Sequence, residues 1–174
     1  MPIFDPEQLS VSTGGRWNKI PAKLINGFSI DSRTMAKGEM FVCLRGERDG
    51  HDFISQAEKA HGTATLVERE DCSSEIPQLI VRDTVHSFQA IAAKHRNLFA
   101  GKVIGVTGSC GKTSTKEALA LLLENSHCTK GNLNNHLGVP LSLLGIEHAE
   151  NDFSVIEAGI NQRDEMESLA KIID

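Results

Sequence analysis

The stretch "KVIGVTGSCGKTSTKE", residues 102–117, decides the fold of the second half of the chain. Its first five residues predict a buried strand, and residues 112–126 predict a helix. Glycines stand in the turn between them, at positions 108 and 111. A strand, a glycine turn and a helix in this order are typical of a loop that binds phosphate. The helix is indicated by apolar residues that repeat at helical spacing, namely Ala118, Leu119, Leu122 and Leu123.

The residue types in this turn suit a nucleotide phosphate. Glycines let backbone N–H groups surround the oxygens, a lysine reaches the outer phosphates, and a hydroxyl binds Mg²⁺. The strict spacing of such loops requires a glycine at position 106, where Val106 stands. A glycine turn without a ligand is the alternative, but a lysine in the first helical turn opposes the helix dipole unless an anion is present. We therefore predict phosphate binding, with the parts supplied in order by Gly108, Gly111, Lys112 and Thr113.

A second strand carries the acidic residue that such a site needs. The segment "FSVIEAG", residues 153–159, predicts a buried parallel strand with Glu157 near its end. A carboxylate that follows four mostly apolar residues is costly to bury unless it is paired or bound to a metal. We expect Thr113 and Glu157 to share a Mg²⁺ ion. A solvated carboxylate at a strand end is the alternative.

The first half of the chain also predicts alternating strands and helices. Strands are expected at residues 40–44, 64–68 and 78–82, and a helix at 51–62 that Gly62 closes. A second helix is expected after Asp83 or Thr84, either of which can cap it. We place the domain boundary at its start, which gives domains of 1–83 and 84–174. The apolar face of this second helix is expected to comprise Val85, Phe88, Ile91, Ala92 and Leu98.

Composition and charge exclude several classes of protein. The net charge of −5 argues against a nucleic-acid partner, and no apolar run is long enough to cross a membrane. The start, "MPIFDPEQLS", lacks the basic and apolar regions of a signal peptide. The four cysteines and seven histidines show no metal-binding or redox spacing. We expect a cytoplasmic protein with reduced thiols and no membrane insertion.

Three spaced motifs resemble those of one enzyme family. "TGSCGKTSTKE" (107–117), "GNLNNHLGVPLSLL" (131–144) and "EAGIN" (157–161) are similar to the successive signatures of the ATP-dependent Mur ligases, which build the peptidoglycan precursor. The shortened phosphate loop is this family's own variant. The segment "GNLNNHLGVP" resembles in particular the MurF type, which joins D-Ala-D-Ala to UDP-N-acetylmuramoyl-tripeptide. Residues 29–68 are similar to the small domain with which MurE and MurF enzymes hold the uridine diphosphate of their substrate.

The resemblance implies a fold, a reaction and a set of site residues. The fold is α/β, with a small amino-terminal domain followed by the first part of a doubly wound P-loop sheet. ATP phosphorylates the substrate carboxylate, and the incoming amine attacks the resulting acyl phosphate. Lys112 and Glu157 have the catalytic roles, and Thr113 and Glu157 hold Mg²⁺. The ATP loop would comprise Gly108, Ser109, Cys110, Gly111, Lys112, Thr113 and Ser114. The substrate would contact Ser32, Arg33, Gly46, Asp49, Gly50, Asn134 and Asn135.

The chain departs from the family pattern at Cys110, where asparagine is usual, and at Gln162 and Asp164 after "EAGIN". A whole Mur ligase has three domains, so we expect the 174 residues alone not to catalyse ligation. Two alternatives remain open. One is a MurE-type ligase, which adds a diamino acid, and the other is a non-catalytic paralogue that binds a UDP-sugar or nucleotide.

Overall fold

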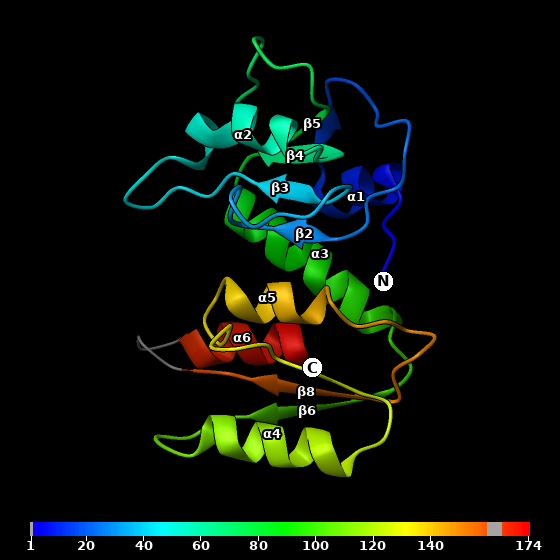
Figure 1. The fold of residues 1–174 in the computed structure, drawn as a ribbon, viewed down its shortest axis with the longest axis vertical. Coiled ribbons are helices and arrows are strands. Elements are labelled where there is room, and N and C mark those ends of the chain that lie inside the picture. The colour runs from blue at the N-terminus through cyan, green and yellow to red at the C-terminus, as the bar shows by residue number, and fades with distance from the viewer. Residues whose placement is uncertain (1, 160–164) are drawn as a thin grey trace. The chain divides into compact units, whose positions relative to one another are not determined.

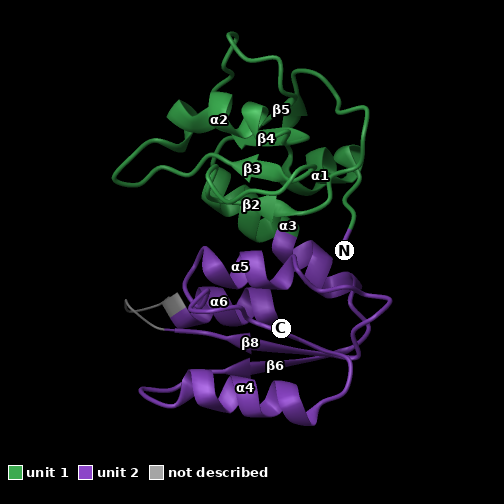
Figure 2. Cartoon of the chain, viewed as in Figure 1, with its two compact units in different colours: residues 1, 3–91 green, residues 2, 92–174 purple. Residues whose placement is uncertain are grey.

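A computed structural model describes residues 2–159 and 165–174. The chain divides into two compact units (Figure 2). Unit 1 comprises Ile3–Ile91, and unit 2 comprises Ala92–Asp174 together with Pro2. The division lies inside helix α3, Thr84–Leu98, which contributes its first half to unit 1 and its second half to unit 2.

Unit 1 is built on a five-stranded sheet with the order β1-β5-β4-β3-β2. Strands β2 to β5 are parallel to their neighbours, and β1 pairs antiparallel with β5. The mixed α/β architecture predicted from the sequence is confirmed. The elements of this unit before α3 are α1 (Pro6–Thr13), β1 (Arg16–Trp17), β2 (Phe28–Ser29), β3 (Met40–Val42), the 3-10 helix η1 (Gly50–Phe53), α2 (Ile54–Lys59), β4 (Ala64–Val67) and β5 (Gln78–Ile80).

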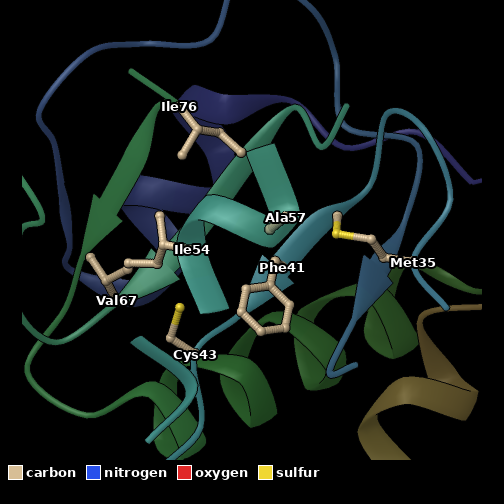
Figure 3. Close-up of a cluster of buried hydrophobic side chains, with 7 residues drawn as sticks. All are labelled: Met35, Phe41, Cys43, Ile54, Ala57, Val67 and Ile76. Atoms are coloured by element: carbon tan, nitrogen blue, oxygen red, sulfur yellow. The ribbon is translucent and has the colours of Figure 1, made fainter. Parts of the chain in front are cut away.

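Both faces of this sheet are covered, because successive side chains point to opposite faces and every residue of β3 and β4 is buried. On one face, Phe28 of β2 contacts Phe88 of α3. The other face packs against α2 through a cluster of buried side chains (Figure 3). This cluster consists of Met35, Phe41, Cys43, Ile54, Ala57, Val67 and Ile76.

The predicted helix at 51–62 is wrong in form and at its end. The chain forms η1 and then α2, which ends at Lys59. The left-handed residue after α2 is His61, with φ of 59°, and not Gly62. Gly62 instead allows close packing, because a Cβ there would lie 2.8 Å from the Met35 side chain.

Helix α3 begins where the sequence predicts. The Asp83 carboxylate accepts a hydrogen bond from the His86 N–H, so Asp83 is the capping residue. Of the predicted apolar face, Phe88, Ile91 and Ala92 are buried, whereas Leu98 is 62% exposed.

Unit 2 is built on a three-stranded parallel sheet with the order β6-β8-β7. Helix α4 covers one face, and helices α5 and α6 lie on the other (Figure 1). The central strand β8 is buried from Ser154 to Glu157, whereas most of β6 is only partly covered by the described residues. The elements are β6 (Lys102–Val106), α4 (Lys112–Leu122), β7 (Ser126–Cys128), α5 (Gly138–Leu143), β8 (Phe153–Glu157) and α6 (Glu165–Ile173).

Helix α4 differs from the prediction in length and in the face that it buries. It ends at Leu122, four residues before the predicted end, because β7 begins at Ser126. Leu121 and Leu122 are 89% and 79% exposed. The residue of α4 that is buried among the described residues is a charged one, Lys116.

Candidate nucleotide-binding site

The loop between β6 and α4 has the backbone of a phosphate-binding loop. Gly108 and Gly111 have φ angles of 149° and 75°, a region that disfavours residues with a Cβ. No atom lies within 4 Å of a Cβ built on Gly111, so space remains open above the start of α4. The Lys112 Nζ donates a hydrogen bond of 2.7 Å to the Gly108 carbonyl, so the lysine folds back over the loop. The loop therefore presents free helix N–H groups and an ammonium group to the same space.

The other residues expected to bind ATP lie in this loop. Ser109 and Cys110 are exposed, and Ser114 is exposed in the first turn of α4. The backbone at these positions is accessible to a ligand.

Glu157 is brought to the loop by the register of the sheet. It pairs with Val106, the last residue of β6, and is 2% exposed. Thr113 Oγ1 donates a hydrogen bond of 3.1 Å to Glu157 Oε2, and Asn134 Nδ2 donates one of 2.8 Å to Oε1. Three separate segments, α4, β8 and the 131–135 loop, thus meet at one carboxylate.

The environment of Glu157 keeps it ionised. Burial alone would raise the pKa of this carboxyl. Hydrogen bonds from Asn134, Thr113 and Lys116 outweigh burial and lower the pKa below its usual value. The carboxylate is therefore ionised at neutral pH.

Lys116 is a residue of this site that the sequence analysis missed. Its side chain is 3% exposed, and its Nζ lies 3.4 Å from Glu157 Oε2 and 3.2 Å from the Gly131 carbonyl oxygen. The available signal was its position three residues after Thr113, which places both side chains on one face of α4.

Asn134 and Asn135 have different surroundings. The Asn134 amide contacts Glu157, whereas Asn135 Oδ1 accepts hydrogen bonds from the N–H groups of Leu137 and Gly138. Asn135 therefore caps the turn that leads into α5, and of its side-chain amide only the nitrogen remains for a ligand. A Cβ at Gly138 would lie 2.4 Å from the Leu133 carbonyl carbon, so the 131–135 loop can pack this closely against the start of α5 only because residue 138 is glycine.

The donor set fits Mg²⁺ in its chemistry. The Thr113 hydroxyl and the Glu157 carboxylate supply hard oxygen atoms 3.1 Å apart, beside the phosphate loop. Because the Thr113 hydroxyl donates its hydrogen bond to Glu157, the lone pairs of the hydroxyl oxygen face away from Glu157 and are free for a cation. In the part of the chain that is described, no group of three or more His, Cys, Asp or Glu residues could hold a metal ion.

Unit 1 contains a cavity of about 580 Å³ that brings together some of the residues expected to bind substrate. Ser32, Arg33 and Gly50 line it, together with Arg48. Phe53 supplies an apolar surface, and Phe41, which is 2% exposed, lies at the border between the cavity and the buried cluster. Basic groups beside aromatic rings suit a ligand that has both an anionic part and a planar part.

The charged groups at this cavity are ordered by local pairs. Arg33 donates to both carboxylate oxygens of Asp31, at 2.9 and 2.6 Å. Hydrogen bonds from Arg33 lower the pKa of the Asp31 carboxyl to about 2. The Ser32 hydroxyl donates to Gln56 Oε1 at 3.0 Å. The turn is therefore already ordered without a ligand.

Asp49 holds the 45–50 loop in place through hydrogen bonds. Its carboxylate accepts hydrogen bonds from the backbone and the ring of His51 and from Arg69, which lower the pKa of its carboxyl. His51 Nε2 accepts from the Glu68 N–H, so the ring donates to Asp49 through Nδ1. Asp49 and Gly46 do not line the cavity of 580 Å³. Gly50 is required for packing, since a Cβ there would lie 2.6 Å from the Leu44 nitrogen.

Gln162 and Asp164 lie outside the described residues. No helix within 2–159 or 165–174 is long and apolar enough to cross a membrane.

The parallel sheet, the glycine loop, Lys112 and the buried Glu157 define unit 2 as a P-loop fold. Family models then identify the chain more closely. The model described as "Mur ligase family, catalytic domain" matches residues 24–126, more than half of the chain, and "Mur ligase middle domain" matches residues 106–174. The chain belongs to the Mur ligase family.

Individual relatives are similar over most of this chain. A UDP-N-acetylmuramoyl-tripeptide–D-alanyl-D-alanine ligase from Synechocystis is 41% identical over 85% of this chain and 34% of its own length. A crystal structure of MurF from Acinetobacter baumannii has a TM-score of 0.91 at 38% identity, over 99% of this chain and 39% of its own. MurF from Thermotoga maritima in complex with ADP has a TM-score of 0.71 at 33% identity, over 84% of this chain and 35% of its own. The chain thus spans about a third of the length of these relatives.

Proposed function

We propose that this chain supplies the ATP-binding and UDP-substrate-binding parts of a cytoplasmic MurF-type ligase. The reaction joins D-Ala-D-Ala to UDP-N-acetylmuramoyl-tripeptide in peptidoglycan precursor synthesis. The observation that carries the proposal is the meeting of Thr113, Asn134 and Glu157 at the phosphate loop. This meeting unites all three motifs on which the family resemblance rests.

In unit 2, the chain's own groups position and neutralise anions. Helix N–H groups and Lys112 bind the ATP phosphates, and Thr113 and Glu157 hold Mg²⁺. Bound Mg²⁺ neutralises phosphate charge, so that a substrate carboxylate can approach the γ-phosphate. The Asn134 amide fixes the orientation of Glu157 and faces the reacting groups. The protein supplies no nucleophile, because the substrate carboxylate and the incoming amine are the reacting groups.

In unit 1, the cavity holds the uridine diphosphate. Arg33, Arg48 and the Ser32 hydroxyl bind the diphosphate oxygens, and the Phe53 ring packs against the base. Asp49 acts through His51 and Arg69 to hold the 45–50 loop in place. These roles divide the protein into a substrate-binding part, 1–83, and an ATP-binding part, 84–174.

Separate titrations test the two binding functions. We expect Mg·ATP and UDP-N-acetylmuramoyl-tripeptide each to bind the 174-residue chain at one site, as measured by isothermal titration calorimetry. Arg33→Met should weaken binding of the UDP compound and leave that of Mg·ATP unchanged. Absence of binding of the UDP compound, with a folded unit 1, would contradict the assignment of the cavity.

Product assays test the reaction itself. We expect the 174 residues alone to form no product from ATP, UDP-N-acetylmuramoyl-tripeptide and D-Ala-D-Ala. A ligase that contains this chain should use D-Ala-D-Ala in preference to diaminopimelate or lysine. Preference for a diamino acid would identify the MurE-type reaction instead.

A further inference from the structure

We propose that Lys116 is a resident counter-cation for Glu157, so that the site excludes a free divalent cation and accepts the cation only together with nucleotide phosphates. This inference deepens the proposed function, since it concerns the same nucleotide site. It assigns a positioning role to a residue that does not line the phosphate loop.

The first argument is the burial of both charges. The side chains of Lys116 and Glu157 are 3% and 2% exposed, and their charged atoms lie 3.4 Å apart. A buried carboxylate without a partner is strongly destabilising, so the metal-free protein needs a positive charge here. Lys112 does not supply it, because its Nζ is bonded to the Gly108 carbonyl at the loop.

The second argument is the way in which Lys116 is held. Its Nζ also donates to the Gly131 carbonyl at 3.2 Å, at the start of the segment that carries Asn134. Lys116 therefore joins α4, β8 and the 131–135 loop, while Asn134 binds the other oxygen of the same carboxylate. A lysine tied at two points cannot swing out of the way as an exposed lysine can.

The consequence follows from charge balance. With Lys116 in place, the pair has no net charge, and a free divalent cation gains little by approaching it. A cation that carries nucleotide phosphates brings its own negative charge, which Lys112 and the helix N–H groups bind. The site therefore selects the metal–nucleotide complex over the free metal.

Free Mn²⁺ provides the direct test, because it accepts the same oxygen ligands as Mg²⁺ and is detected by electron paramagnetic resonance. We expect Lys116→Met to bind free Mn²⁺ at least about tenfold more tightly than the unmodified chain. Lys171→Met is the matched control, since Lys171 is an exposed lysine paired with Glu167. It should leave Mn²⁺ affinity unchanged. Equal Mn²⁺ affinity of Lys116→Met and the unmodified chain would overturn the proposal.

Thermal unfolding in EDTA provides a second readout. Lys116→Met should lower the midpoint by at least about 5 °C, and saturating Mn²⁺ should restore at least half of this loss. The double variant Lys116→Met/Glu157→Gln should be more stable than Lys116→Met, because it leaves no unpaired buried charge. If Lys116→Met does not fold, the double variant must fold for the proposal to stand. A double variant no more stable than Lys116→Met would refute it.

These readouts are independent of the proposed ligase activity. A chain that shows them and binds no UDP compound would refute the proposed function alone. A chain that binds ATP and the UDP compound but shows neither readout would refute the role of Lys116 alone.

Discussion

Replacing Asn134 by aspartate tests the geometry at Glu157 with almost no change in shape. In the protein, Asn134 Nδ2 donates to Glu157 Oε1 at 2.8 Å. In Asn134→Asp, two carboxylate oxygens would face each other at that distance, and they cannot both stay ionised. One of them must take up a proton to restore the hydrogen bond.

The cost of that proton sets the expected loss of stability. Holding a proton on a carboxyl of ordinary pKa, about 3.9, costs about 1.4 kcal/mol for each pH unit above it. The expected loss in the free energy of unfolding is therefore about 4 kcal/mol at pH 7 and about 1.5 kcal/mol at pH 5. The penalty of this variant should shrink as the pH falls.

Urea unfolding in EDTA, followed by circular dichroism at both pH values, measures these losses. Asn132→Asp is the matched control, because Asn132 is exposed and its replacement adds the same charge two residues earlier in the chain. It should change the free energy of unfolding by no more than about 0.5 kcal/mol. The reasoning would be refuted if Asn134→Asp were as stable as Asn132→Asp at pH 7. A penalty that does not change between pH 7 and pH 5 would also refute it.

Two further predictions concern packing and acid stability. Gly138→Ala should cost at least about 2 kcal/mol in the free energy of unfolding, because its Cβ would lie 2.4 Å from backbone of Leu133. Gly46→Ala, with open space around it, should be nearly neutral in the same urea experiment, and an equal effect would contradict this account. Burial lowers the pKa of His95 to about 4, so the folded protein takes up this proton at lower pH than the unfolded chain. The free energy of unfolding should therefore rise from pH 4 to about pH 6.5 and then level off. This rise should be smaller in His95→Gln than in a variant of the exposed His86. Equal slopes in the two variants would show that His95 is not responsible.

The sequence predicted the parts of the site that depend on local spacing and parallel pairing. Gly108, Gly111 and Lys112 lie where the strand gives way to the helix, and both elements begin at the residues that the sequence predicts. Glu157 was expected beside the loop because parallel neighbouring strands end at the same edge of a sheet. The register of β6 and β8 confirms that expectation.

Tertiary contacts decided the features that the sequence did not predict. The apolar pattern of α4 indicated a buried face that includes Leu122, yet this residue is largely exposed and Lys116 is buried. The burial of Lys116 depends on the Glu157 carboxylate and the Gly131 carbonyl, which come from segments far along the chain. Asp49 also depends on a contact that is not local: Arg69 joins the neighbouring His51 in holding its carboxylate, so that Asp49 supports the 45–50 loop.

The central claim is that the 107–114 loop binds nucleotide phosphates through Lys112. Calorimetric titration of Mg·ATP into the chain and into Lys112→Met tests it most directly, with Lys171→Met as the control for loss of a lysine. We predict binding by the unmodified chain and by the control, and affinity at least about tenfold lower in Lys112→Met. Absence of binding by the folded, unmodified chain, or equal affinity in Lys112→Met, would contradict the claim.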